Sequence, residues 1–241
     1  MSEEKIIQHA EKAVHAVSNK KLSWKQKLKE LLQEVLIIVF AISITLAFHN
    51  WNDHKKEQEI EREFLEGTRN DLKDVKTILT DGAKEFQGTI DFYDTLWTRL
   101  LANRATPGFI DSNAGQFTNT LYFIYDKGRF EGFKSSGYLR LIENKKLQDE
   151  IISLYTTDMP FEESADANVF RTREHDFITY IGSKAPIDST GMHISKIIDD
   201  PAVRYQIQRY VDYFNERKRH KAELAQRIDK VIKDIDAELD K

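Results

Sequence analysis

The most compact group of side chains that could do chemistry is the acid and imidazole cluster Glu174, His175 and Asp176. If folding brought His193 or His220 close, this cluster could bind zinc or transfer protons, because carboxylates and imidazoles do both. A zinc site needs at least three converging ligands, and the chain has neither an HExxH motif nor two histidines four residues apart. We therefore expect no metal site, and favour a charged outer face on a helix over residues 161–181.

A second candidate is the turn within residues 130–141, where aromatic residues alternate with glycines. We take it as a candidate ligand turn with the central residues Phe133, Lys134, Ser135, Ser136, Gly137 and Tyr138. Either serine could cap a helix beginning near the glycine, and the amide donors at such a helix start suit a carboxylate or a phosphate. The commoner use of such a turn is an ordinary cap whose aromatic residues pack into the core, and we favour that interpretation.

Two further polar groups have simpler explanations. His49 and His54 could make a pH-sensitive contact, but lone histidines of this kind usually serve as polar anchors. The basic run at 217–221, RKRHK, could meet anionic lipid or an acidic partner, yet a solvated helical face is the default for such a run. No catalytic or cofactor motif is present, so we expect a protein that is not an enzyme and binds no cofactor.

Composition narrows the function classes. The 241 residues contain 36 Lys plus Arg against 40 Asp plus Glu, for a formal net charge of −4. A nucleic-acid-binding protein would need a concentrated basic face, so nucleic acid is not an expected partner. The absence of cysteine excludes disulfides and thiolate metal sites.

The only long apolar run of the chain lies at 31–51, LLQEVLIIVFAISITLAFHNW. From Val35 to Phe48 its only polar residues are Ser43 and Thr45, whose hydroxyls can bond to carbonyls of the preceding helical turn. As a helix, the stretch from Leu31 to Phe48 spans about 27 Å, close to a hydrocarbon core of about 30 Å. We therefore predict a transmembrane helix, with its juxtamembrane start, over residues 23–51.

A cleaved signal peptide is the alternative to a retained anchor. The lead before the strictly apolar stretch that begins at Val35 exceeds thirty residues, and the nearest cleavage-like tripeptide, at 45–47, matches A-x-A poorly. We favour the retained anchor, in contact with the lipid bilayer. The predicted anchor residues are Trp24, Glu34, Asn50, Trp51 and Asn52. The two indoles lie roughly 40 Å apart along a helix, which suits the two aromatic belts of a bilayer, and the glutamate can reach the interface.

The charges that flank the run predict its orientation. The lysines on its N-terminal side are Lys20, Lys21, Lys25, Lys27 and Lys29. The other flank has only Lys55 and Lys56, diluted by acidic residues. The positive-inside rule places the N-terminus in the cytoplasm and about 190 residues in the periplasm or outside the cell. We therefore expect an inner-membrane protein with a periplasmic domain.

The periodicity of the rest predicts an all-α fold: a cytoplasmic amphipathic helix at 1–22, the membrane helix, and an extended antiparallel helical bundle at 52–241. Two heptad rows are expected to pack against each other. Their members are Leu65, Leu72, Leu79, Phe86, Tyr93 and Leu100 in the first row, and Ile207, Phe214, Ile228 and Ile235 in the second, which Lys221 interrupts. Between the rows we expect shorter helices, separated near 105–108, 128–132, 158–160 and 182–191.

Two segments of the chain resemble a family of single-pass membrane proteins of the Bacteroidota that is catalogued as a domain of unknown function. In that family a Glu opens the apolar span, Asn-Trp-Asn closes it, and a Lys-Ser-Ser-Gly turn leads into a helix. The matching positions here are Glu34, Asn50 to Asn52, and Lys134 to Gly137. The resemblance covers most of residues 33–158 and, more loosely, the C-terminal helix, and the lead is longer than is usual in the family. It implies topology and fold but no activity.

We therefore expect a non-enzymatic, single-pass protein whose helical bundle mediates protein assembly or senses a ligand. An interaction module is the simpler of the two, because the cytoplasmic lead is too short to hold an output domain. The expected partners are a second copy of the chain or another membrane protein. Two alternatives remain: an accessory subunit or enzyme acting on the cell envelope, and a secreted helical domain released by signal cleavage.

Overall fold

The computed structural model describes residues 24–119 and 122–241, almost all of them helical. The chain divides into two units, Met1–Ile60 and Glu61–Lys241, which we call the N-terminal and C-terminal units. The predicted boundary, between residues 51 and 52, falls nine residues before this division. The predicted amphipathic helix at 1–22 lies outside the described residues.

One long helix, α2 (Trp24–Leu101), contributes residues to both units. The remaining elements all belong to the C-terminal unit. They are α3 (Pro107–Ser112), η1 (Ala114–Phe117), α4 (Gly128–Ser135), η2 (Tyr138–Leu141), α5 (Lys145–Ser153), η3 (Leu154–Asp158), α6 (Met159–Arg173), η4 (Glu174–Ile178), α7 (Thr179–Lys184), β1 (Ile187–Asp188), β2 (Gly191–Met192), η5 (Ile194–Lys196) and α8 (Pro201–Leu239). The two strands form a small antiparallel hairpin in an otherwise α-helical unit.

Local sequence explains where several helices begin. Asp200 caps α8 by accepting a hydrogen bond from the amide of Ala202 (2.8 Å), and Pro201 occupies the first turn. Thr106 and Pro107 start α3 in the same way. Since proline has no amide hydrogen to lose and its φ suits a helix, it fits a first turn well.

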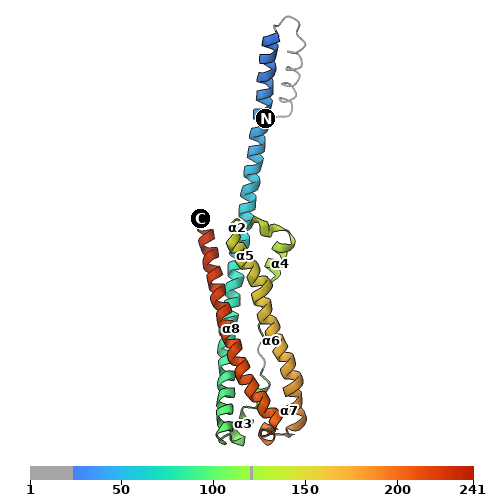
Figure 1. Ribbon diagram of the computed structural model, residues 1–241, viewed down its shortest axis with the longest axis vertical. Coiled ribbons are helices and arrows are strands. Elements are labelled where there is room, and N and C mark those ends of the chain that lie inside the picture. Colours follow the sequence, from blue (N-terminus) through green and yellow to red (C-terminus); the bar gives the residue numbers. More distant parts are fainter. Residues whose placement is uncertain (1–23, 120–121) are drawn as a thin grey trace. The chain divides into compact units, whose positions relative to one another are not determined.

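In the C-terminal unit, α2 and α8 pack antiparallel (Figure 1). Residues further along α2 contact residues nearer the start of α8. Arg69 pairs with Asp236 (3.2 Å), Lys76 pairs with Asp229 (2.6 Å), and Lys218 donates to Gln87 (2.5 Å). The guanidinium of Arg62 donates to the carbonyl of Leu239 (3.0 Å), so α8 ends beside the start of the unit.

Both heptad rows form the core of this unit. Nine of the predicted packing residues are at most 5% exposed: Leu65, Leu72, Leu79, Tyr93, Leu100, Ile207, Phe214, Ile228 and Ile235. The tenth, Phe86, lies in α2. Since these rows face each other within one chain, they are not available for contacts between chains.

The third side of the bundle is one continuous helical rod from α5 to α7. Two π-helical turns, η3 and η4, join its three α-helices. The predicted break at 158–160 is therefore wrong, and we attribute the continuity to the wide turn just before Pro160, which leaves room for a ring that would otherwise clash with the preceding turn. The break expected at 128–132 is also wrong, because these residues form most of α4.

Gly67 of α2 lies where α4 approaches closely. A Cβ at this position would overlap the guanidinium of Arg129, which is bound to Asp71 (2.8 Å). Glycine costs about 1 kcal/mol relative to alanine inside a helix, so the contact with Arg129 offsets a loss of helix propensity.

Gly67→Ala should therefore depend on Arg129. In an Arg129→Ala background we expect it to raise the free energy of unfolding by about 1 kcal/mol, and in the parent chain by less, because Arg129 must move aside. Gly82→Ala, also in α2 but with open space around its Cα, is the matched control. Chemical denaturation of the four variants measures the difference. Equal gains in both backgrounds would contradict the close approach.

Candidate functional site

The apolar run of α2 is exposed in the N-terminal unit. Val35, Phe40, Ile44 and Phe48 are between 46% and 68% exposed, and no residue of the most apolar window is buried. By length and composition this stretch of α2 can cross a membrane. The hydroxyl of Thr45 donates to the carbonyl of Ala41 (2.9 Å), which confirms the predicted bond to the preceding turn.

The predicted anchor residues lie at both ends of this run. Trp24 is 70% exposed and Trp51 is 54% exposed. The ring of Trp51 packs edge-on against Phe48 and lies 4.2 Å from the ammonium of Lys55, a cation–π contact. Asn50 and Asn52 are exposed on either side of it.

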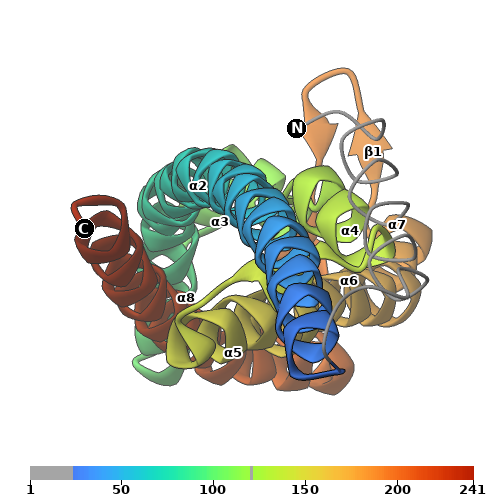
Figure 2. The ribbon, with the colours of Figure 1, turned by 90° about the horizontal axis from the view of Figure 1, so that it is seen from above.

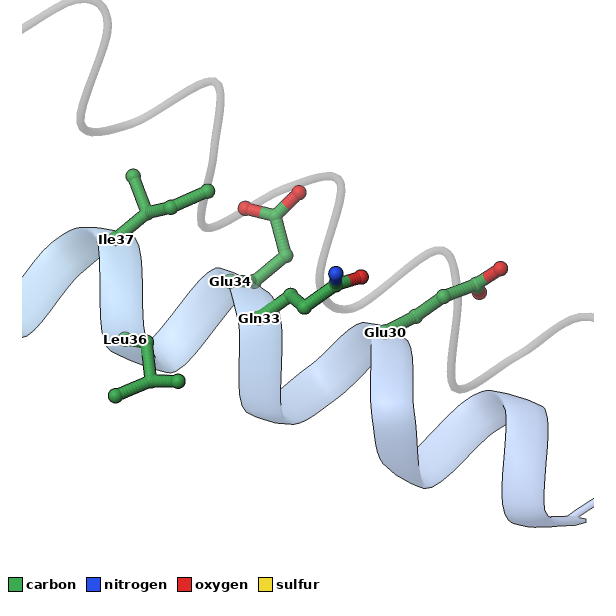
Figure 3. Close-up of a pocket in the computed structure, with 5 residues that line it drawn as sticks. All are labelled: Glu30, Gln33, Glu34, Leu36 and Ile37. Atoms are coloured by element: carbon green, nitrogen blue, oxygen red, sulfur yellow. The ribbon is translucent and has the colours of Figure 1, made fainter.

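Glu34 lies where polar residues give way to the apolar run. The residues Glu30, Gln33, Glu34, Leu36 and Ile37 line a pocket beside α2. Glu30, Gln33, Glu34 and Ile37 project from one side of the helix, whereas Leu36 points to the other (Figure 3). Spacings of three and four residues produce this shared face. It carries two carboxylates and an amide directly before the hydrocarbon-like segment.

The Lys134–Tyr138 turn ends α4 and leads into the short 3-10 helix η2, whose start no side chain caps. Ser135 is the last residue of α4, and the hydroxyl of Ser136 donates to the carbonyl of Gly132 (2.9 Å). Gly137 follows with φ of +72°, the left-handed conformation that commonly terminates helices. A helix does begin near Gly137, as predicted, but the prediction that Ser135 or Ser136 caps it is wrong, because η2 has no side-chain cap bond. A helix end presents carbonyl oxygens, so it does not favour an anion.

The aromatic residues of this turn pack into the core. Phe133 stacks on Phe64 of α2, with ring centroids 3.7 Å apart, and Tyr138 meets the edge of Phe133 (5.8 Å). Lys134 is exposed, with Glu131 at 3.7 Å. The next α-helix, α5, is capped by Asn144, which accepts from the amide of Leu147 (3.2 Å).

The Glu174–Asp176 cluster lies on the π-turn η4. His175 is largely exposed and bonds Asp176 (2.8 Å). The two other candidate histidines have different neighbours: His193 contacts two aspartates elsewhere, and His220 lies beside Glu216. Within residues 24–119 and 122–241, no three His, Cys, Asp or Glu side chains are arranged to hold a metal ion.

His193 joins its own hairpin segment to α3, which lies 82 residues earlier in the sequence. Its Nδ1 lies 3.2 Å from Asp111 of α3, and its Nε2 lies 2.9 Å from Asp188 of β1. Ser195 of η5 also donates to Asp111, from both its amide (2.9 Å) and its hydroxyl (2.8 Å). We call His193, Asp111 and Asp188 the imidazole clasp. It holds the β-hairpin, which projects beside α7, to α3 (Figure 2).

Only the protonated ring can donate to both carboxylates at once. The hydrogen bonds to Asp188 and then Asp111 raise the pKa of His193 above its ordinary value. Bonds from Thr190, together with His193, lower the pKa of Asp188 to about 2. The clasp is therefore fully charged between the low pKa of the aspartates and the raised pKa of the histidine.

The clasp should make stability depend on pH. A raised pKa in the folded state gives stabilisation that is complete below the unfolded pKa of about 6.5 and is lost as pH rises through the folded value. We expect His193→Gln to lower the midpoint of thermal unfolding more at about pH 5.5 than at about pH 8.5. His175→Gln, at an exposed site, is the control. A difference that does not change with pH would contradict the charged clasp.

Two acids and two bases form a buried charge cluster between α6 and α8. Glu162, Asp166, Arg217 and Lys221 are each at most 5% exposed. Arg217 pairs with both carboxylates, at 3.2 Å from Asp166, and Lys221 lies 2.5 Å from Asp166. The expectation of a solvated basic face at 217–221 is therefore wrong for these two residues. They lie four apart on α8, and their charges are balanced by two carboxylates on α6.

The charge cluster also fixes the segment that precedes α4. The amide of Phe123 donates to Asp166 (3.0 Å), and the ammonium of Lys221 lies 5.3 Å from the Phe123 ring. Burial raises the pKa of Glu162, and the charges of Arg217 and Lys221 oppose this rise. A lysine at an apolar heptad position, Lys221, was the signal in the sequence that could have revealed this cluster.

Arg173 is a second buried charge, only 2% exposed, at the junction of α6 and η4. Its acceptors are the carbonyls of Gln116 (2.8 Å), Phe117 (2.7 Å) and Asn119 and the hydroxyl of Tyr93 (3.0 Å). Its guanidinium also lies over the rings of Tyr210 (5.3 Å) and Phe214 (5.6 Å). It makes no ion pair in the part of the chain that the structure describes, so dipoles and aromatic faces stabilise its charge.

Comparisons with known proteins give no independent assignment. No family model matches the chain, and neither the curated proteins nor the solved structures searched contain a significant match. The resemblance to the Bacteroidota family therefore stays a prediction.

Proposed function

We propose that the chain is a single-pass membrane protein whose C-terminal unit acts as a non-enzymatic interaction module. The observation that carries this proposal is the exposed apolar run of α2. Leaving about ten large apolar side chains in water would cost roughly 1.5–3 kcal/mol each relative to burial. A bilayer removes that cost, and the helix satisfies its own backbone hydrogen bonds.

The flanking charge supports an orientation with the N-terminus in the cytoplasm and the C-terminal unit in the periplasm of an inner membrane. Trp51, exposed and in contact with Lys55, suits an interfacial anchor at the far end of the span. The resemblance to the Bacteroidota family implies the same topology.

An interaction role fits the C-terminal unit better than catalysis. The buried charges of the unit are used in its own hydrogen bonds, and its most compact acid and imidazole cluster is exposed on one helix. Because the heptad rows are used inside the unit, any contact with a second copy or another membrane protein has to involve its outer surface.

Topology can be tested by labelling, since the chain has no cysteine. A single cysteine at exposed Ser136 should react with a membrane-impermeant maleimide in spheroplasts. A cysteine at Ser18, in the lead, should react only after the membrane is permeabilised. The reverse pattern would overturn the orientation. Release of the protein by alkaline carbonate, or an intact mass lacking the lead, would overturn the anchor.

A further inference from the structure

The segment from Tyr122 to Lys127 runs lengthwise between α2 and α6, without helical or sheet pairing (Figure 1). The Tyr122 ring lies 4.9 Å from Phe170, the Phe123 amide bonds Asp166, and the Tyr125 ring lies 6.4 Å from Tyr155. As residue numbers increase along the segment, the numbers of the residues that it contacts on the helical rod decrease, so the segment runs antiparallel to α6. We call it the edge segment.

The edge segment has the alternation of a strand. Phe123 and Tyr125 are 3% and 8% exposed, whereas Tyr122 and Ile124 are 46% and 66% exposed. In an extended chain the main-chain groups of neighbouring residues point to opposite sides. The amide of Phe123 points toward α6, so the amide and carbonyl of Ile124 point away from it. In the described part of the chain these Ile124 groups have no hydrogen-bond partner.

Tyr122 and Ile124 are exposed, so no element within residues 24–119 and 122–241 covers this side of the edge segment. Viewed along the bundle, the short α4 lies between α2 and α6 (Figure 2). Ile78 of α2 is 42% exposed and follows Asp71, which binds Arg129 of α4, by seven residues. Residues seven apart share a helix face, so Ile78 faces the same side as the edge segment. Tyr122 and Ile124, two residues apart, therefore form an exposed apolar strip along the edge segment, and Ile78 is an exposed apolar side chain on the α2 face that meets α4.

The rod carries two carboxylates beside this strip. Glu163 of α6 and Glu174 of η4 form no ion pair within residues 24–119 and 122–241. Burial raises the pKa of Tyr125 to about 12, and Glu163 and Glu131 add to the rise. Burial also raises the pKa of Tyr122, with a contribution from Glu174. Helix geometry also places both carboxylates near the edge segment, because Glu163 precedes Asp166, which binds the Phe123 amide, by three residues and Glu174 follows Phe170, whose ring meets Tyr122, by four.

We propose that the edge segment binds an extended, basic segment of another protein, which adds as a strand on Ile124. Main-chain bonds to Ile124 would give affinity, alternate apolar side chains would cover the strip, and lysines or arginines would pair with Glu163 and Glu174. This inference rests on the proposed interaction role but not on the membrane anchor. Carbonate extraction tests the anchor and peptide binding tests the edge segment, so a negative result in one experiment does not decide the other.

The test uses the full chain in an uncharged detergent and three fluorescent heptapeptides. The peptides are KVKVKVK, its acidic counterpart EVEVEVE, and a helix-forming lysine and alanine peptide of equal charge. Fluorescence anisotropy measures their binding to the parent chain, to Glu163→Gln/Glu174→Gln, and to a control that removes two charges elsewhere, Glu63→Gln/Glu223→Gln. Ile124→Pro removes the edge amide, and Ile124→Thr keeps it.

We expect only KVKVKVK to bind. The Glu163→Gln/Glu174→Gln pair should weaken binding about fivefold or more, and Ile124→Pro about tenfold, while the control pair and Ile124→Thr have little effect. No binding of KVKVKVK, tighter binding of the helical peptide, or equal weakening by the control pair would overturn the proposal. If Ile124→Pro fails to fold, as judged by circular dichroism, the glutamate pair still decides the outcome.

Discussion

Replacing Asp166 by alanine should lower the free energy of unfolding by about 3–5 kcal/mol, because it leaves buried cations without their partner. Asp166 accepts hydrogen bonds from Arg217, Lys221 and the Phe123 amide, and all four residues are buried. Removing one member of such a cluster exposes the full cost of burying the others. Chemical denaturation followed by circular dichroism measures the change, with Asp149→Ala, at an exposed site, as the control.

The same cluster predicts that a second substitution rescues the first. Asp166→Leu/Lys221→Leu removes one charge of each sign and leaves Glu162 to pair with Arg217. We expect this double variant to be more stable than Asp166→Leu alone, with a coupling energy of about 0.5–3 kcal/mol. Simple addition of the two single effects would show that the charges do not act as one unit.

Arg173→Met should cost about 3–5 kcal/mol for a different reason. Its four acceptors would remain buried without a donor, and an unsatisfied buried group costs roughly 1–3 kcal/mol. The loss should loosen the connection between η1 and the α6–η4 junction. Native-state hydrogen exchange at residues 114–119, together with denaturation, measures both effects.

Arg171→Met is the matched control, since Arg171 lies on the same helix but is exposed and bonds only Asn168 (2.7 Å). We expect it to change stability by less than about 0.5 kcal/mol. Similar losses for the two variants would mean that the buried hydrogen bonds of Arg173 do not stabilise the fold.

Periodicity predicted the large elements of this fold and missed its polar interior. Leu72 and Ile228 belong to rows of apolar residues that repeat at helical spacing. These rows are long enough that a single polar residue does not hide the pattern, so the helices and the burial of the two residues followed from the sequence. Pro160 was read as a break because sequence alone does not show the π-turn that accommodates it. Lys221 and Arg217 were read as solvated because their neutralising partners, Glu162 and Asp166, are more than fifty residues away.

The candidate sites also differed in how far the sequence alone predicted them. The exposed apolar run depends on composition alone and was predictable, whereas the imidazole clasp depends on Asp111 and His193, 82 residues apart, which only the tertiary fold brings together. Ser135 and Ser136 were misread because a serine before glycine fits a helix start and a helix end equally well in sequence. The left-handed conformation of Gly137 decides between them.

The contact between Arg62 and Leu239 has a mechanical consequence. Because α2 enters the C-terminal unit at the same end at which α8 leaves it, tension applied between Glu61 and Lys241 loads their cross-links one after another, as in unzipping. Tension applied between Glu61 and Pro201, the far end of α8, instead pulls α2 and α8 past each other and shears the Arg69, Lys76 and Lys218 contacts together. The unit should therefore yield at low force when pulled by its C-terminus and resist when pulled from its opposite end.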